Sequence, residues 1–310
     1  MRVDVTHYTD PGCPWAYSAS PAIAALMWRF GDRLSWRHVM IGLAEDGERY
    51  ARSGYTPVRR VKSNRRFERW GMPFSMSLKP HISGTSRGCR AIIAVRLQDP
   101  EREWAALRAL QFMQFTTAGT LDDDAFMRAA LETVPGVDAD AAIAAIDSAD
   151  VLAAYEADRA AARTAEGTPT DVQGKTAATD GPVRYTAPSI SFTYGDRTLE
   201  AGGFQPLQAY DVVLANLAPE LERRTPPEDI AEVLAAFPDG LTTAEVAEIY
   251  TSGPAAEVDR VEIEDRLLEA TFDGRLVRET LGDGDRWFEP ASYPGKGWLP
   301  SDTSTSAAFR

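Results

Sequence analysis

The chain has 310 residues, of which 44% are apolar and 25% charged, and its formal net charge is −13. This length exceeds one compact domain and predicts two. No run approaches the roughly 18 consecutive apolar residues that a membrane span needs, so we expect no membrane association. The segment Met1–Asp4 leads into a strand pattern without the features of a secretory signal. We therefore expect a cytoplasmic protein whose two cysteines are thiols.

The negative charge is concentrated near the C-terminus. Residues 1–224 hold 26 basic and 28 acidic side chains, whereas residues 225–290 hold 5 basic and 17 acidic ones. The change falls at Arg224-Thr225-Pro226-Pro227, where consecutive prolines favour an extended linker. These observations predict a first domain over residues 1–224, an acidic second domain over 225–290 and a polar tail over 291–310.

The first forty residues predict a strand, a helix and a second strand. Residues 3–8 alternate between apolar and polar as a strand does, and Asp10-Pro11-Gly12 is typical of a turn. Pro14 suits the first position of a helix, which we expect to extend to about residue 30. A second strand over 34–41 would then be parallel to the first. This order places Cys13 at the N-terminus of the helix.

The middle of the chain reads as helical. Between Gly42 and about Gly181 the strand pattern disappears, and amphipathic helices are predicted over 86–98, 101–118, 122–132 and 138–165. Strand character returns at 189–194 and pairs with 197–200 as a hairpin, followed by a helix near 206–217. The first domain is therefore predicted to be α/β and thioredoxin-like, with a large helical insertion over about 43–181.

The acidic segment has a pattern of its own. Helices are predicted over 228–237, 241–250 and 259–272, with Thr242 as the N-cap of the second. A hairpin of strands 276–280 and 286–289 follows them. This order resembles a winged helix, a small α+β fold. The third helix carries six acidic residues against two arginines, which would repel phosphates. We expect no nucleic-acid binding, and instead a contact with a protein partner or with a second copy of the chain.

The residues around Cys13 resemble a known motif. The sequence Asp10-Pro11-Gly12-Cys13-Pro14-Trp15-Ala16-Tyr17 is similar to the Asp-x-x-Cys-Pro-Trp-Cys-Tyr motif of the DsbA-like thioredoxin family, particularly its FrnE-type branch. The family's second landmark is a cis-proline that opens the late strand, and Thr186-Ala187-Pro188-Ser189 matches it. The resemblance covers about residues 1–220, and it implies a thioredoxin-like fold with thiol chemistry at Cys13.

The sequence departs from this family at one position. Ala16 stands where the family carries its second, resolving cysteine, so a mixed disulfide at Cys13 would need an external thiol to resolve it. The related 2-hydroxychromene-2-carboxylate isomerases and kappa-class glutathione transferases keep the fold with a single hydroxyl or thiol at this helix start. They use that group to engage glutathione. The resemblance therefore implies a low-molecular-weight thiol of the glutathione or mycothiol type as co-substrate, without a tightly bound cofactor.

Three functions are compatible with these residues. In the leading hypothesis, a thiol oxidoreductase, Cys13 attacks a disulfide of a small thiol or of a protein, and an external thiol resolves the intermediate. In the second hypothesis, a kappa-like thiol S-transferase or isomerase, Cys13 only orients the bound thiol. In the third, the protein is a non-catalytic thioredoxin-like scaffold that binds protein partners through its C-terminal domain.

The residue-level expectations follow from position. The unpaired N–H groups of a helix start favour a thiolate, so we expect a reactive sulfur at Cys13. Cys89 shares a helical face with Ile92 and Ile93 and is predicted to pack in the core. No metal site is expected, because the histidines are scattered and are interpreted as structural: His7, His38 and His81. Five residues are predicted to bind substrate: Pro14, Trp15, Tyr17, Ala187 and Pro188.

Overall fold

The computed structural model describes residues 2–179, 181–251 and 259–295. The predicted polar tail falls outside this description from residue 296 onward. Within the described ranges, no helix combines the length and the apolar composition that crossing a membrane requires.

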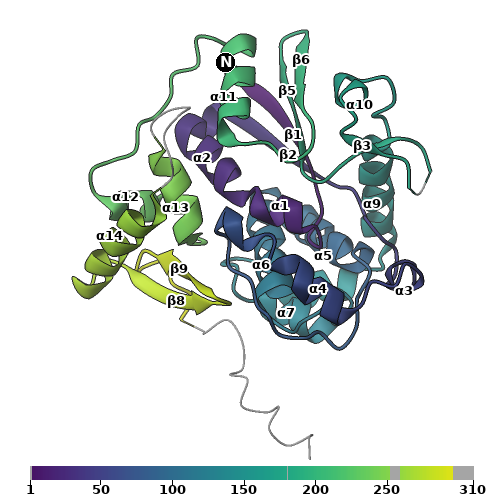
Figure 1. Ribbon diagram of the computed structural model, residues 1–310, viewed down its shortest axis with the longest axis horizontal. Helices are drawn as coiled ribbons and strands as arrows, with labels where there is room; N and C mark the ends of the chain where they lie inside the picture. The colour runs from purple at the N-terminus through teal and green to yellow at the C-terminus, as the bar shows by residue number, and fades with distance from the viewer. Residues whose placement is uncertain (1, 180, 252–258, 296–310) are drawn as a thin grey trace, which may run out of the picture.

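A four-stranded sheet with the strand order β2-β1-β5-β6 lies at the centre of the first part of the chain. β1 (Val3–Thr9) is parallel to β2 (Leu34–Met40) and antiparallel to β5 (Ser189–Tyr194), and β5 pairs with β6 (Arg197–Ala201) in the predicted hairpin. Two helices cover one face of this sheet, packing on its Val, Ile and Phe side chains: α2 (Ser20–Phe30) and α11 (Leu207–Leu217) (Figure 1). The predicted α/β order of a thioredoxin-like fold is confirmed.

The helix predicted from Pro14 to about residue 30 is interrupted. It consists of α1 (Pro14–Ser18) and α2, with Ala19 between them. Pro21 explains the break, because it has no N–H to donate to the carbonyl of Tyr17 four residues earlier. Cys13 is the N-cap residue of α1, as predicted, and has an extended backbone with φ −87° and ψ 114°.

The segment between β2 and β5 is mainly helical, as predicted. Its helices are α3 (Glu48–Arg52), α4 (Pro57–Asn64), α5 (Ser86–Gln98), α6 (Glu103–Thr116), α7 (Asp124–Leu131), α8 (Ala139–Ala145), α9 (Ala149–Ala162) and α10 (Pro169–Val172). Short 3-10 turns cover Glu68–Trp70 and Pro100–Arg102 in this segment, and a further one covers Gly31–Arg33 just before β2. In Figure 1, α4, α5, α6 and α7 lie below the sheet, whereas α9 and α10 lie to its right.

Two expectations for this insertion are wrong in detail. The single helix predicted over 138–165 is divided into α8 and α9, because Ser148 starts a new helix as the N-cap that accepts a hydrogen bond from the N–H of Val151 at 3.4 Å. Strand structure also occurs before residue 181, since β3 (Thr176–Ala177) pairs antiparallel with β4 (Arg184–Tyr185). Such two-residue strands are too short to leave an alternating pattern in the sequence.

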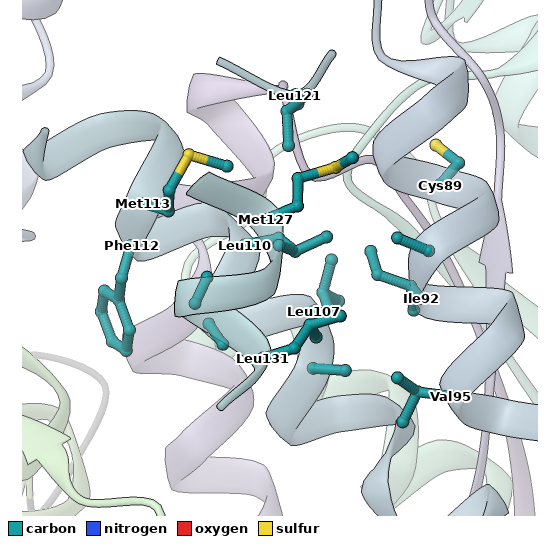
Figure 2. Packing of buried hydrophobic residues seen from close by; sticks show 14 of the residues in the cluster. Cys89, Ile92, Val95, Leu107, Leu110, Phe112, Met113, Leu121, Met127 and Leu131 are labelled. Atoms are coloured by element: carbon teal, nitrogen blue, oxygen red, sulfur yellow. The ribbon is translucent and has the colours of Figure 1, made fainter. Parts of the chain in front are cut away.

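The insertion has its own apolar core between α5, α6 and α7, shown in Figure 2. Cys89 lies in this core on α5 and is fully buried beside Ile92, as its helical position predicted. Its Sγ donates to the Asp10 carboxylate, with an Sγ···Oδ2 distance of 3.6 Å. Both Cys13 and Cys89 are free thiols in the structure.

The region after residue 225 contains helices and a small sheet. Its elements are α12 (Ile230–Ala235), β7 (Leu241–Thr242), α13 (Thr243–Tyr250), α14 (Arg260–Phe272), β8 (Val277–Leu281) and β9 (Gly284–Phe288), and the strands form a sheet of order β7-β9-β8. Thr242 is the N-cap of α13, as predicted, and forms a capping box with Glu245. The predicted hairpin is confirmed, with Gly282 and Asp283 as its turn.

This C-terminal region packs tightly on the first part of the chain. Apolar residues of α13 belong to the same buried cluster as those of α2 and of the central sheet. A buried ion pair joins it to α6, where Arg108 Nη2 lies 2.6 Å from Glu245 Oε2 and both side chains are at most 3% exposed. Residues 225–290 are therefore not separated from the thioredoxin-like part by solvent, and their folding as an independent domain stays a prediction.

Candidate active site

A network around Asp10 fixes the turn between β1 and α1. The Asp10 carboxylate accepts hydrogen bonds from the N–H of Gly12, the N–H of Leu43 and the hydroxyl of Thr85, each at 2.8 Å. Gly12 leaves no room for a side chain, because a Cβ there would lie 2.4 Å from Thr85 Cγ2. Hydrogen bonds therefore hold the turn before Cys13 to Leu43, which follows β2, and to Thr85, which precedes α5.

The sulfur of Cys13 faces the loop that opens β5. Its Sγ donates a hydrogen bond to the carbonyl oxygen of Ala187 at 3.1 Å. The Ala187–Pro188 peptide bond is cis, as the family resemblance implied. Behind this contact, the rings of Tyr8 and Tyr185 stack with centroids 4.1 Å apart and close the apolar cluster around the thiol. The two landmarks read from the sequence therefore lie in direct contact.

Burial opposes the thiolate that the helix start predicts at Cys13, and the reactivity of this sulfur stays a prediction. Burial raises the pKa of Cys13 to about 12, and the charge of Asp10 also raises it. The N–H groups of Ala16 and Trp15 lower the pKa, as expected at a helix start, but desolvation outweighs them. At neutral pH the Cys13 sulfur is a protonated hydrogen-bond donor.

The predicted substrate-binding residues do not share one surface. Trp15 is 41% exposed and rests its ring against Phe67 and Phe204, whereas Tyr17 is only 1% exposed. The Tyr17 hydroxyl donates to the carbonyl of Pro73 at 2.8 Å inside the insertion core. Tyr17 therefore packs the helix start and does not line an accessible groove.

A cavity of about 220 Å³ lies beside Cys13 and is called here the Arg60 pocket. Its lining residues are Gly12, Pro14, Leu43, Tyr50, Ser53, Tyr55, Arg60, Asn64, Ile82, Ser83, Thr85, Gln114 and Phe115. The pocket touches the chain on both sides of Cys13, at Gly12 and Pro14, but Cys13 itself is not among its lining residues. Pro14 is the predicted substrate-binding residue that the structure brings to it.

The Arg60 pocket is lined by a buried positive charge and by polar side-chain atoms that lack hydrogen-bond partners among the described residues. Arg60 is 5% exposed and donates to the carbonyl of Gln114, and among the described residues no acidic side chain is paired with it. Burial lowers its pKa to about 10. Asn64 Nδ2 and Gln114 Oε1 are buried without hydrogen-bond partners. Lys79 lies outside the lining residues and is also buried, and within the described ranges its Nζ has no hydrogen-bond partner. Burial, and then the charge of Arg60, lower the pKa of Lys79.

Sequence reasoning missed these pocket residues. Arg60 lies on α4, whose N-cap Thr56 and strongly polar composition are typical of a solvated surface helix. Arginines are seldom buried without a partner, so nothing local in the sequence distinguishes Arg60 from its exposed neighbour Arg59. Only the packing of α4 against α6 turns Arg60 inward.

The histidines occupy structural positions. His7 and His38 are buried against each other with their Nδ1 atoms 3.1 Å apart, and burial lowers the pKa of both. His81 lies at the surface, 2.8 Å from the Asp122 carboxylate. The described part of the chain contains no group of three or more His, Cys, Asp or Glu side chains arranged to hold a metal ion.

Comparison with known proteins places the site in context. The model of the DsbA-like thioredoxin domain matches residues 4–185. A candidate protein disulfide isomerase from Nitrosomonas europaea has a similar structure, with a TM-score of 0.53 and 16% identity over 70% of this chain and 97% of that one. No curated protein sequence matches the chain.

Two further solved structures are similar at lower scores. The cytosolic disulfide reductase DsbM from Pseudomonas aeruginosa, solved with glutathione, gives a TM-score of 0.48 and 18% identity over 69% of this chain and all of that one. A candidate DsbA oxidoreductase from Streptomyces coelicolor gives a TM-score of 0.49 and 19% identity, over 73% of this chain and 93% of that one. The fold and the cysteine at a helix start define a protein of the thioredoxin-like class. The chain belongs to the DsbA-like thioredoxin family.

Proposed function

We propose that this protein is a thiol oxidoreductase that acts through Cys13 alone and uses an external low-molecular-weight thiol. The observation that carries the proposal is the contact between Cys13 Sγ and the Ala187 carbonyl, with Ala16 at the resolving position. The Arg60 pocket, lined by Gly12 and Pro14 on either side of Cys13, supports a site for the external thiol. Cys89 is bonded to Asp10 within the core, which supports a structural role for the second thiol.

The reaction consists of two thiol–disulfide exchanges. Cys13 loses its proton, and its sulfur attacks one sulfur of a disulfide RSSR, so that Cys13–S–S–R forms and RS⁻ leaves. A second thiolate R′S⁻ then attacks the R sulfur, which releases RSSR′ and the Cys13 thiolate. The raised pKa of Cys13 implies that the rate of the first step increases with pH throughout the neutral range.

The Arg60 pocket supports a co-substrate that carries a carboxylate. A buried guanidinium without an acidic partner attracts an anion, and Asn64 Nδ2 offers a further free donor. A glutathione-type thiol has carboxylates at its ends, whereas the sugar-based part of a mycothiol-type thiol has none. We therefore place the thiol sulfur at Cys13 and a carboxylate at Arg60.

A second function is favoured by one observation, the protonated state of Cys13. In a kappa-like S-transferase or isomerase the Cys13 thiol would keep its proton and donate it in a hydrogen bond to the sulfur of the bound thiol. Burial, which disfavours the thiolate, suits a donor better than a nucleophile.

Intact-mass spectrometry after incubation with glutathione disulfide, combined with calorimetric titration of glutathione, tests the proposal. An oxidoreductase forms an adduct on Cys13 that is lost in Cys13→Ser and retained in Cys89→Ser. A transferase forms no adduct, and Cys13→Ser keeps glutathione affinity because serine is also a donor. Arg60→Gln should weaken binding about tenfold in both cases. If no adduct forms and no glutathione binds, both functions are contradicted and the scaffold hypothesis is left.

We also propose that residues 225–290 form a winged-helix-like unit. The order α12, β7, α13, α14, β8, β9 supports this, with a helix before the first strand and a terminal hairpin. The acidic residues of its third helix, α14, support binding to a protein partner rather than to nucleic acid. For the whole protein we propose a cytoplasmic location.

A further inference from the structure

One segment of the insertion, residues 67–76, lies between the active centre and the C-terminal region, and it is called here the linking segment. On one side it supports the first turns of α1. The ring of Trp15 meets that of Phe67 edge-on at 4.8 Å, and the Tyr17 hydroxyl donates to the carbonyl of Pro73 at 2.8 Å. The Tyr17 ring also contacts that of Phe74, with centroids 5.3 Å apart. Both aromatic residues that follow Cys13 are therefore held by this segment.

On its other side the linking segment is bound by the C-terminal region. In the β8–β9 turn, Asp283 Oδ1 accepts from the N–H of Phe74 at 2.6 Å, and the N–H of Asp283 donates to the Phe74 carbonyl at 3.0 Å. At the start of α14, Arg260 Nη2 donates to the carbonyl of Arg69 at 3.3 Å. The Thr242 hydroxyl lies 3.4 Å from Met72 Sδ.

Two glycines show how close these contacts are. A Cβ on Gly282 would lie 2.8 Å from the Phe74 carbonyl oxygen, and one on Gly71 would lie 1.8 Å from Arg260 Nη1. Both glycines also have positive φ, at +62° and +84°, which disfavours other residues. At Gly282 the two parts of the chain therefore meet backbone to backbone, whereas at Gly71 the guanidinium end of Arg260 occupies the place of a side chain.

We propose that the C-terminal region is a positioning element of the Cys13 centre, and that Asp283 and Arg260 are its positioning residues. They act on the linking segment, and the segment holds Trp15 and Tyr17. These two residues fix the helix turn that begins at Cys13, whose carbonyl accepts a hydrogen bond from the Tyr17 N–H at 3.0 Å. This role goes beyond the proposed function, because it assigns a task to the part of the chain that follows residue 185, where the family match ends.

The double variant Asp283→Ala with Arg260→Ala tests this role in the full chain. It removes the side-chain links that Asp283 and Arg260 make to the segment. It leaves untouched the charged and titratable groups that act on Cys13, namely Asp10, Arg184 and Tyr50. We expect iodoacetamide to alkylate Cys13 about tenfold faster at pH 8, as a fall of one pKa unit would produce. Cys89 serves as the internal control and should keep its rate.

Two further variants separate positioning from stability. The double variant Arg275→Ala with Asp229→Ala removes an exposed ion pair in which Arg275 Nη1 lies 2.6 Å from Asp229 Oδ1. This pair lies within the C-terminal region and does not contact the linking segment. The variant should lower the melting temperature without accelerating either cysteine. Asp283→Asn keeps an acceptor for the Phe74 N–H and should retain the native Cys13 rate. Equal acceleration of Cys13 and Cys89, or an unchanged Cys13 rate in the double variant, would overturn the proposal.

Discussion

The protonation state of Cys13 gives the most direct prediction from the structure. Its thiol has a pKa of about 12, compared with 9.0 for a free cysteine side chain, because burial disfavours the thiolate. A difference of three units corresponds to about a thousandfold lower thiolate fraction at pH 8. Since only the thiolate is alkylated, we expect Cys13 in the folded protein to react about a thousandfold more slowly than in the unfolded chain.

The assay follows iodoacetamide labelling of both cysteines by peptide mass at pH 7, 8, 9 and 10, with the chain in urea as the unfolded reference. The folded rate at Cys13 should increase about tenfold with each pH unit and should not level off below pH 10. Cys89, whose pKa burial also raises, should react slowly throughout. A rate at Cys13 within tenfold of the unfolded reference, or a plateau below pH 9, would refute this reasoning.

Three other predictions address the departure from the family, the domain contact and the charge. Ala16→Cys should form an internal disulfide with Cys13 under mild oxidation and gain dithiol reductase activity, whereas oxidation only between molecules would contradict the helix-start geometry. Glu245→Ala leaves Arg108 buried without its ion pair and should lower the free energy of unfolding by about 3–5 kcal/mol, measured as a lower thermal midpoint. As a control, Asp140→Ala removes an exposed ion pair with Arg128 and should lower the free energy of unfolding by less than about 1 kcal/mol. The full chain should not bind mixed-sequence duplex DNA in a fluorescence titration at physiological salt.

The sequence predicted the fold where local chemistry decides structure. The strand over β5, the Gly195-Asp196 turn and the capping of α13 by Thr242 each depend on residues adjacent in the chain, and each is confirmed. The position of Cys13 at the start of α1 is of the same kind. The helix break at Ala19 was not predicted from the sequence, because the apolar pattern continues across that residue. Pro21 was the signal that could have indicated the break.

The properties of the site could be predicted less well because they depend on contacts between distant segments. The pKa of Cys13 reflects burial against Ala187, which lies far along the chain, and this burial opposes the local effect of the helix start. The inward position of Arg60 likewise requires α6, whose Gln114 carbonyl it binds. Residue type and spacing point to Cys13 as the candidate reactive residue, but the environment of its sulfur is a property of the assembled fold.

The buried cluster that joins α2 to α13 has a consequence for how the protein is made. Translation adds roughly 5–20 residues per second, so α2 leaves the ribosome about ten to forty seconds before α13 does. During that interval part of the apolar surface of α2 has no intramolecular cover. The nascent chain therefore exposes apolar surface that can aggregate or be bound by chaperones, and the helix that finally covers it is among the last to be synthesised.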